Sequence, residues 1–209
     1  MKKHCGFSII ELLIALLIFS FVGIGILASF KYFEVAGVLS LKKAMCLHEL
    51  RSGLDYMKHD MLIAKGLYVS GGTTPSTTPT FPASFNTVND NALTLVVPSV
   101  NASGQFIDIT DDNYNDYIHY SVNSSKQIIR EVVRSIAAGS ARDTGSVTLA
   151  ERVASLTFSN GVTNLGSLTS SQLASMNFVV VTLTAQINTT LGGTPVTKTL
   201  IMEVVFRNF

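Results

Sequence analysis

The stretch "MKKHCGFSIIELLIALLIFSFVGIGILASF" (residues 1–30) decides the architecture of this chain of 209 residues. Between Phe7 and Phe30 it carries a single formally charged side chain, that of Glu11. As a helix, the segment would extend over roughly 36 Å at about 1.5 Å per residue. The hydrocarbon core of a membrane is about 30 Å thick, so the sequence predicts one transmembrane helix over 7–30.

Glu11 is an unusual residue for such a segment. A charge within a membrane helix costs about 2–4 kcal/mol on insertion scales, and less near the end of the span. Ionisable residues in membrane helices are usually functional, which is one interpretation of Glu11. The other is that its side chain simply extends to the polar interface. Its position alone leaves both open.

The surrounding residues argue against a cleaved secretory signal peptide. The apolar run is longer than an ordinary signal segment, and no small-residue cleavage site follows it. The next residues, "KYFEVAGVLSLKKAM" (31–45), still have a helical pattern. The segment is therefore expected to stay attached as a membrane helix. Lys2 and Lys3 favour a cytoplasmic N-terminus by the positive-inside rule.

The order "KKHCG" then "FSIIELLIALLIF" resembles the leader of the type IV prepilin and type II secretion pseudopilin family. The shared features are a short basic leader ending in Gly6, then Phe7, then Glu11 at the fifth mature position of an apolar helix. The resemblance implies that a prepilin peptidase cleaves between Gly6 and Phe7 and methylates the new amino group of Phe7. It also implies that Glu11 pairs with the positive N-terminus of a neighbouring subunit. Such pairing is sound physically, because a buried carboxylate is tolerated only when it has a partner.

The helix is expected to continue well beyond the membrane segment. No proline occurs before Pro75, so one helix is predicted from about Phe7 to Tyr68. Apolar residues recur in its second half at three- and four-residue steps and predict a buried stripe: Leu47, Leu50, Leu54, Met57, Met61, Ala64 and Tyr68. The expected divisions are a leader (1–6), a transmembrane and assembly helix (7–30), an amphipathic helix half (31–69), a proline-containing linker (70–90) and a β-rich domain (91–209).

Short runs of β-branched and aromatic residues predict strands in the C-terminal part. The candidates are 92–97, 105–109, 116–122, 127–134 and one region at 146–159, with a hairpin turn at 123–126 and a short helix or loop at 167–176. A long hairpin is predicted from 177–188 and 197–206. Its alternating residues should share a face, namely Val179, Val181, Leu183, Ala185 and Ile187 on one strand and Leu200, Met202, Val204 and Phe206 on the other. The predicted fold class is α+β and pilin-like, with the long N-terminal helix packed on an antiparallel β-sheet.

Charge and cysteine content narrow the function classes. The chain has 15 Lys and Arg against 14 Asp and Glu, a balance that argues against a nucleic-acid-binding surface. Its two cysteines, Cys5 and Cys46, provide no disulfide framework. After leader removal only Cys46 remains, and it is expected to be a buried helix residue rather than a reactive thiol or an intersubunit disulfide.

The chain offers few candidates for catalysis or metal binding. One helical face carries His48, Ser52, Asp55 and His59, which could bind a metal but are explained more simply as a solvated polar face. In "DDNYNDY" (111–117), Asp111, Asn113 and Asn115 alternate as at the start of a calcium loop, but Asp116 and Val122 stand where an EF-hand needs Gly and Glu. These three residues therefore form only a weak Ca²⁺ candidate beside the ordinary interpretation of a polar turn. We expect no cofactor and no enzymatic activity.

Two further segments resemble particular members of the family. The stretch "LRSGLDYMKHDMLIAKGLY" (50–68) and the ending "LIMEVVFRN" (200–208) are similar to PilW-type minor pilins and J-type minor pseudopilins. The resemblance implies a minor type IV pilin that helps to prime assembly at or near the pilus tip. The alternatives are a J-like minor pseudopilin of a type II secretion system, or a tip adhesin that binds through the 70–116 loops.

The same resemblance implies the partners and the location of the chain. The expected partners are other minor and major pilins, the prepilin peptidase, the inner-membrane assembly platform and the membrane itself. The precursor is expected to be a single-pass inner-membrane protein with a cytoplasmic N-terminus, and the mature chain to enter a periplasmic or extracellular filament.

Overall fold

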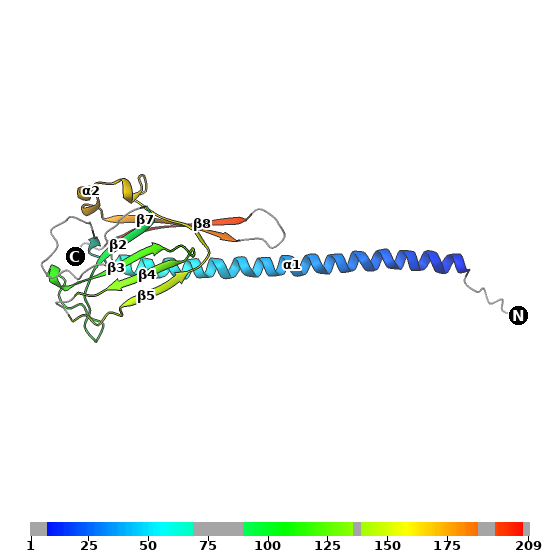
Figure 1. Cartoon of the computed structure of the whole chain (residues 1–209), viewed down its shortest axis with the longest axis horizontal. Coiled ribbons are helices and arrows are strands. Elements are labelled where there is room, and N and C mark those ends of the chain that lie inside the picture. Colours follow the sequence, from blue (N-terminus) through cyan, green and yellow to red (C-terminus); the bar gives the residue numbers. More distant parts are fainter. Residues whose placement is uncertain (1–7, 69–89, 136–138, 188–194, 207–209) are drawn as a thin grey trace. The chain divides into compact units, whose positions relative to one another are not determined.

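The computed structural model describes residues 8–68, 90–135, 139–187 and 195–206 (Figure 1). The chain divides into two compact units, one ending at Ala44 and one beginning at Met45. The helix α1 (Ile9–Leu62) contributes to both. The predicted leader (1–6), Phe7 and most of the predicted linker (70–90) lie outside the described residues.

In the first unit, α1 is long and apolar enough to cross a membrane. Its most apolar 18-residue window has a mean hydropathy of 2.7, and none of that window is buried by other parts of the protein. The hydroxyls of Ser20 and Ser29 each donate a 2.8 Å hydrogen bond to a carbonyl one turn earlier, those of Leu16 and Gly25. A membrane helix has to satisfy its polar groups internally, and both serines do so.

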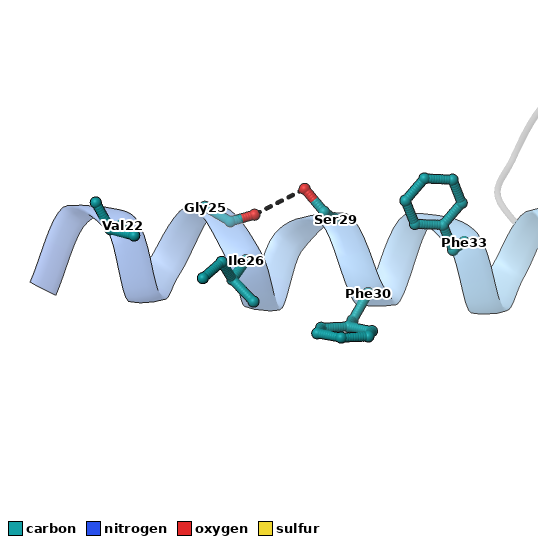
Figure 2. Close-up of a pocket in the computed structure, with 6 residues that line it drawn as sticks. All are labelled: Val22, Gly25, Ile26, Ser29, Phe30 and Phe33. Carbon is teal, nitrogen blue, oxygen red and sulfur yellow. Dashed lines mark hydrogen bonds between the residues drawn. The ribbon is translucent and has the colours of Figure 1, made fainter. Parts of the chain in front are cut away.

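Figure 2 shows the Ser29–Gly25 bond beside a shallow hollow of the apolar helix, lined by Val22, Gly25, Ile26, Ser29, Phe30 and Phe33. The hollow exists because Gly25 has no side chain and Ser29 turns its short side chain back onto the backbone.

In the second unit, the last part of α1 buries one side against the sheets. Its buried residues are Cys46, Leu50, Gly53, Leu54, Met57, Asp60 and Met61. The predicted stripe is thus confirmed at Leu50, Leu54, Met57 and Met61, as the amphipathic pattern requires. A Cβ atom on Gly53 would lie 3.5 Å from both the Ala150 Cβ atom and the Leu149 carbonyl oxygen. The helix therefore approaches the sheet closely at Gly53.

α1 ends at Leu62, so the prediction that it reaches Tyr68 was wrong. Residues Gly66–Leu67 instead form strand β1, and the flanking amide groups join it: the Lys65 N–H donates to the Val96 carbonyl (2.8 Å) and that of Tyr68 to the Thr94 carbonyl (2.9 Å). Gly66 is a poor helix former, and pairing with a neighbouring strand satisfies these backbone groups equally well.

The first sheet has five antiparallel strands in the order β1-β2-β3-β4-β5. After β1 these are β2 (Ala92–Pro98), β3 (Asn115–Val122), β4 (Ile128–Val133) and β5 (Gly145–Ala150), with the 3₁₀ helix η2 (Asp112–Tyr114) before β3. Strands at 92–97, 116–122 and 127–134 are thereby confirmed. The turn at 123–126 is confirmed as well, closed by a 3.1 Å bond from the Lys126 N–H to the Asn123 carbonyl.

The second sheet has three antiparallel strands in the order β6-β7-β8: β6 (Val153–Ser159), β7 (Phe178–Ile187) and β8 (Val196–Val205). Between β6 and β7 lie η3 (Leu165–Ser167) and α2 (Ser170–Ala174). The predicted hairpin is confirmed, and so is its alternation, because all five named β7 residues belong to the buried core. On β8, Val204 and the following Phe206 are buried, and Leu200 and Met202 pack against the core.

Two strand predictions were wrong. The region 146–159 is divided between β5 and β6, which belong to different sheets. The chain turns between them at Arg152, whose φ of 60° is incompatible with a continuous strand. The segment 105–109 makes only an isolated bridge, between Phe106 and Val100. There the Asn101 side chain accepts bonds from the Ser103 and Gln105 amides, which replaces ladder pairing with a local turn.

One hydrophobic core joins the end of α1 to both sheets. The fold is a long N-terminal helix packed on antiparallel β-sheets, a pilin-like α+β arrangement, which confirms the predicted class with the sheet divided in two.

Candidate functional site

The start of α1 carries the acidic residue that the sequence singled out. Ser8 precedes the helix, and its carbonyl accepts the first helical bond from the Leu12 N–H (3.1 Å). Glu11 Oε2 accepts a 3.0 Å hydrogen bond from the Ser8 N–H. A glutamate that reaches back to the amide of the N-cap residue forms one half of a capping box. The pattern "SIIE" (8–11) contains this signal, which the sequence reading overlooked.

The surroundings of Glu11 are apolar and open. The flanking Ile9, Ile10 and Leu12 are 78, 67 and 56% exposed. A carboxylate at a helix N-terminus is favoured by the helix dipole, and the Ser8 bond uses only one of its oxygens in the described structure. The arrangement provides an acceptor for a cationic partner at the edge of an apolar surface. It is suited to assembly between chains.

The polar residues on the second part of α1 do not converge. His48, Ser52, Asp55 and His59 are exposed along one side of the helix. Eleven positions separate the two histidines, about 16 Å along a helix axis, which is far beyond the span of one coordinated ion. Among the described residues, no group of three or more His, Cys, Asp or Glu side chains could hold a metal ion.

The structure uses the residues of the weak calcium candidate in different ways. Asp111 Oδ1 accepts 2.9 Å bonds from the backbone and side-chain nitrogens of Asn113, and thereby caps η2. Asn115 lies buried at the start of β3. Calcium binding by these three residues stays a prediction.

Two buried carboxylates were missed by the sequence reading, and the first is Asp60. It is 4% exposed and lies on the buried side of α1. Its Oδ2 accepts hydrogen bonds from the Tyr120 hydroxyl (2.5 Å) and from Arg130 Nε (2.6 Å). Tyr120 belongs to β3 and Arg130 to β4, so this cluster fastens the helix to the first sheet. A signal existed, because Asp60 occupies a core position between Met57 and Met61.

The electrostatics of this cluster agree with a charged pair and a neutral phenol. Burial, and then the charge of Asp60, raise the pKa of Tyr120 well above its ordinary value. Burial alone would lower the pKa of Arg130, but its hydrogen bond and charge interaction with Asp60 raise it overall.

The second missed carboxylate, Asp116, has no exposed surface and pairs with Arg142.

Cys46 is 1% exposed, which confirms the prediction of a buried helix residue. Burial, and then the charge of Glu49, raise the pKa of its thiol. Since the thiolate is the reactive form, the thiol is held in its inert state.

A family model described as the prokaryotic N-terminal methylation motif matches residues 1–27, the segment that contains Gly6, Phe7 and Glu11. The chain is type IV pilin-like. No curated protein matches it. The motif is that of a structural, non-enzymatic family, which confirms the prediction that the pilin-like chain is not an enzyme.

The motif has consequences for processing and location. It implies cleavage by a prepilin peptidase and assembly with pilins. Together with the apolar first part of α1, it indicates an inner-membrane precursor that assembles into a filament.

Proposed function

We propose that the pilin-like chain is a minor type IV pilin, a structural subunit that helps to prime filament assembly at or near the pilus tip. The observation that carries the proposal is the carboxylate of Glu11, held at the start of an exposed apolar helix within the methylation motif.

The chemistry of this helix start couples processing to assembly. Before cleavage, the nitrogen of Phe7 is an uncharged amide nitrogen in the Gly6–Phe7 peptide bond. Cleavage converts it into an amine that is positively charged near neutral pH. Only a processed subunit then offers the cation that a neighbour's Glu11 requires in a low-dielectric environment. In an isolated subunit, the Ser8 N–H bond and the helix dipole stabilise the Glu11 carboxylate.

The role as a minor subunit is supported by two resemblances to PilW-type minor pilins. The first, residues 50–68, contains the part of α1 that packs in the core together with β1. The second, residues 200–208, covers the second half of β8.

The number of copies in the filament tests this role. Sheared, purified filaments should contain the processed chain at a small fraction of the abundance of the major pilin, as measured by quantitative mass spectrometry. Deletion of the gene should reduce the number of filaments per cell. Abundance equal to the major subunit, or an unchanged filament number after deletion, would contradict a priming role.

Both resemblances are shared with J-type minor pseudopilins, which makes this the second candidate. Here the deletion should abolish export of secreted enzymes through a type II system and leave surface filaments unchanged. The two deletion phenotypes are distinct, so one strain separates the candidates.

A tip adhesin is the third candidate, favoured by Phe106 and Ile107, which are 37 and 36% exposed between β2 and β3. Replacing both with serine should abolish attachment while the filament number stays unchanged. If attachment persists, these residues are not a binding surface.

A further inference from the structure

The fully buried Asp116 lies where two connections of the first sheet meet. It is the second residue of β3 and has no exposed surface. The β2–β3 connection (99–114) and the described parts of the β4–β5 connection (134–135 and 139–144) lie at the same end of the sheet, since β2, β3, β4 and β5 are successive antiparallel neighbours. Asp116 bonds to residues of both connections.

Four donors surround its carboxylate. Oδ1 accepts from Ser99 Oγ (2.9 Å) and the Ser135 N–H (3.0 Å). Oδ2 accepts from Ser140 Oγ (2.7 Å) and Arg142 Nε (3.0 Å). A carboxylate offers about four lone-pair positions, so its acceptor capacity is filled.

Arg142 extends the cluster to the backbone. Its Nη2 donates a 2.9 Å bond to the Pro98 carbonyl, and its own carbonyl accepts from Arg134 Nε. The side chain is 13% exposed. Further bonds link the two connections directly: the Ala141 N–H donates to the Val100 carbonyl (2.7 Å), and Ser135 Oγ donates to the Asn113 carbonyl (2.6 Å).

A buried carboxylate surrounded only by neutral donors would leave an uncompensated charge. Arg142 is the cation that contacts Asp116 among the described residues. We propose that Arg142 is an internal counter-cation that closes this end of the pilin-like domain, so that its two connections fold without a bound divalent cation. The inference is independent of the proposed function. The neighbouring segment 111–115 resembles the start of a calcium loop. A metal ion that entered beside Asp116 would nevertheless have to displace Arg142 and would face the hydrogen atoms of the three other donors.

Thermal unfolding of the full chain in detergent, followed by circular dichroism, tests the proposal. Arg142→Met should lower the unfolding midpoint by roughly 6–15 °C, because it leaves the buried Asp116 carboxylate without a counter-cation. The double variant Asp116→Asn/Arg142→Met removes that charge and should recover more than half of the loss. The control Arg51→Met removes an exposed arginine from α1 and should shift the midpoint by less than about 2 °C.

Three results would overturn the proposal. The wild-type midpoint should be the same in calcium and in EDTA, so a midpoint that rises with calcium and falls with EDTA contradicts it. A double variant less stable than Arg142→Met would mean that the uncompensated charge of Asp116 is not what destabilises the Arg142→Met protein. An Arg142→Met midpoint equal to the wild-type value would mean that Asp116 needs no cation.

A conservative variant keeps the test informative if Arg142→Met does not fold. Arg142→Lys retains the charge but loses the bond to Pro98, and it should keep a folded domain. Hydrogen exchange should then increase in residues 99–114 and stay unchanged in β7 and β8. Failure of Arg142→Lys to fold, or an increase spread evenly over both sheets, would contradict a charge-based local closure.

Discussion

Replacing Asp60 with alanine should destabilise the domain far more than an ordinary substitution at one helix position does. The change leaves the buried Tyr120 hydroxyl without its acceptor and removes the counter-ion of Arg130. An unsatisfied buried hydroxyl costs about 1–3 kcal/mol. Breaking a fully buried ion pair costs about 3–5 kcal/mol, a value we reduce because the Arg130 side chain is 18% exposed and can reach water. The expected loss is about 4 kcal/mol.

In a domain of this size, that loss corresponds to a fall of roughly 8–16 °C in the unfolding midpoint. The assay is thermal unfolding of the full chain in detergent, followed by the strand signal in circular dichroism. Tyr120→Phe removes one of the two bonds and should cost only about 1–2 kcal/mol. His59→Ala changes the adjacent exposed side chain and should stay within about 0.5 kcal/mol of the wild type. An Asp60→Ala midpoint no lower than that of Tyr120→Phe would refute the ion-pair argument.

Three further predictions follow from buried groups. Burial lowers the pKa of His119 to about 4, whereas a histidine in the unfolded chain has a pKa near 6.5. As the pH falls, the unfolded chain therefore binds a proton before the folded protein does. The free energy of unfolding should consequently fall by up to about 3 kcal/mol between pH 6.5 and 4. His119→Gln should remove that part of the pH dependence in urea titrations, and an unchanged profile would exclude His119 as its source. The mature protein should run alike on reducing and non-reducing gels, because Cys46 is buried and no other cysteine remains; a dimer band lost on reduction contradicts this. Gly53→Ala should be neutral or stabilising by up to about 1 kcal/mol in urea unfolding, since the added carbon meets its neighbours at van der Waals distance. Gly53→Leu adds a larger side chain at the same place and should cost about 1–3 kcal/mol. Equal stability of these two variants would disprove the close approach of α1 to β5.

The parts of the fold that sequence reading predicted are those governed by local periodicity. Leu50, Leu54, Met57 and Met61 repeat at helical spacing, and the alternating residues of β7 repeat at strand spacing, so each pattern names its own buried face. The leader motif was readable for the same reason, because its residues lie close together in the chain.

The parts that were missed depend on contacts between distant residues. Asp60 meets Arg130 across 70 positions, and Asp116 meets Arg142 across 26, so no local pattern connects them. The end of α1 near Leu62 likewise depends on β2, which supplies the partners of Lys65 and Tyr68. The capping role of Ser8 and Glu11 was local and could have been found from the spacing of serine and glutamate.

The most direct test of the proposed assembly function compares two substitutions in the N-terminal motif. Glu11→Val removes the carboxylate and makes the span more apolar, so the protein should still insert and be cleaved. Gly6→Val places a bulkier residue at the bond that the peptidase must reach, so it should leave a full-length precursor with Lys2 and Lys3. Mass spectrometry of the N-terminus identifies each product, and co-purification with the other pilins measures assembly.

We expect Glu11→Val protein to begin at methylated Phe7, to accumulate in the inner membrane and to be lost from the complex with other pilins. Cleaved Glu11→Val protein that co-purifies with those pilins at the wild-type level would contradict the pairing of Glu11 with a neighbour's N-terminus, and with it the proposed role in filament assembly.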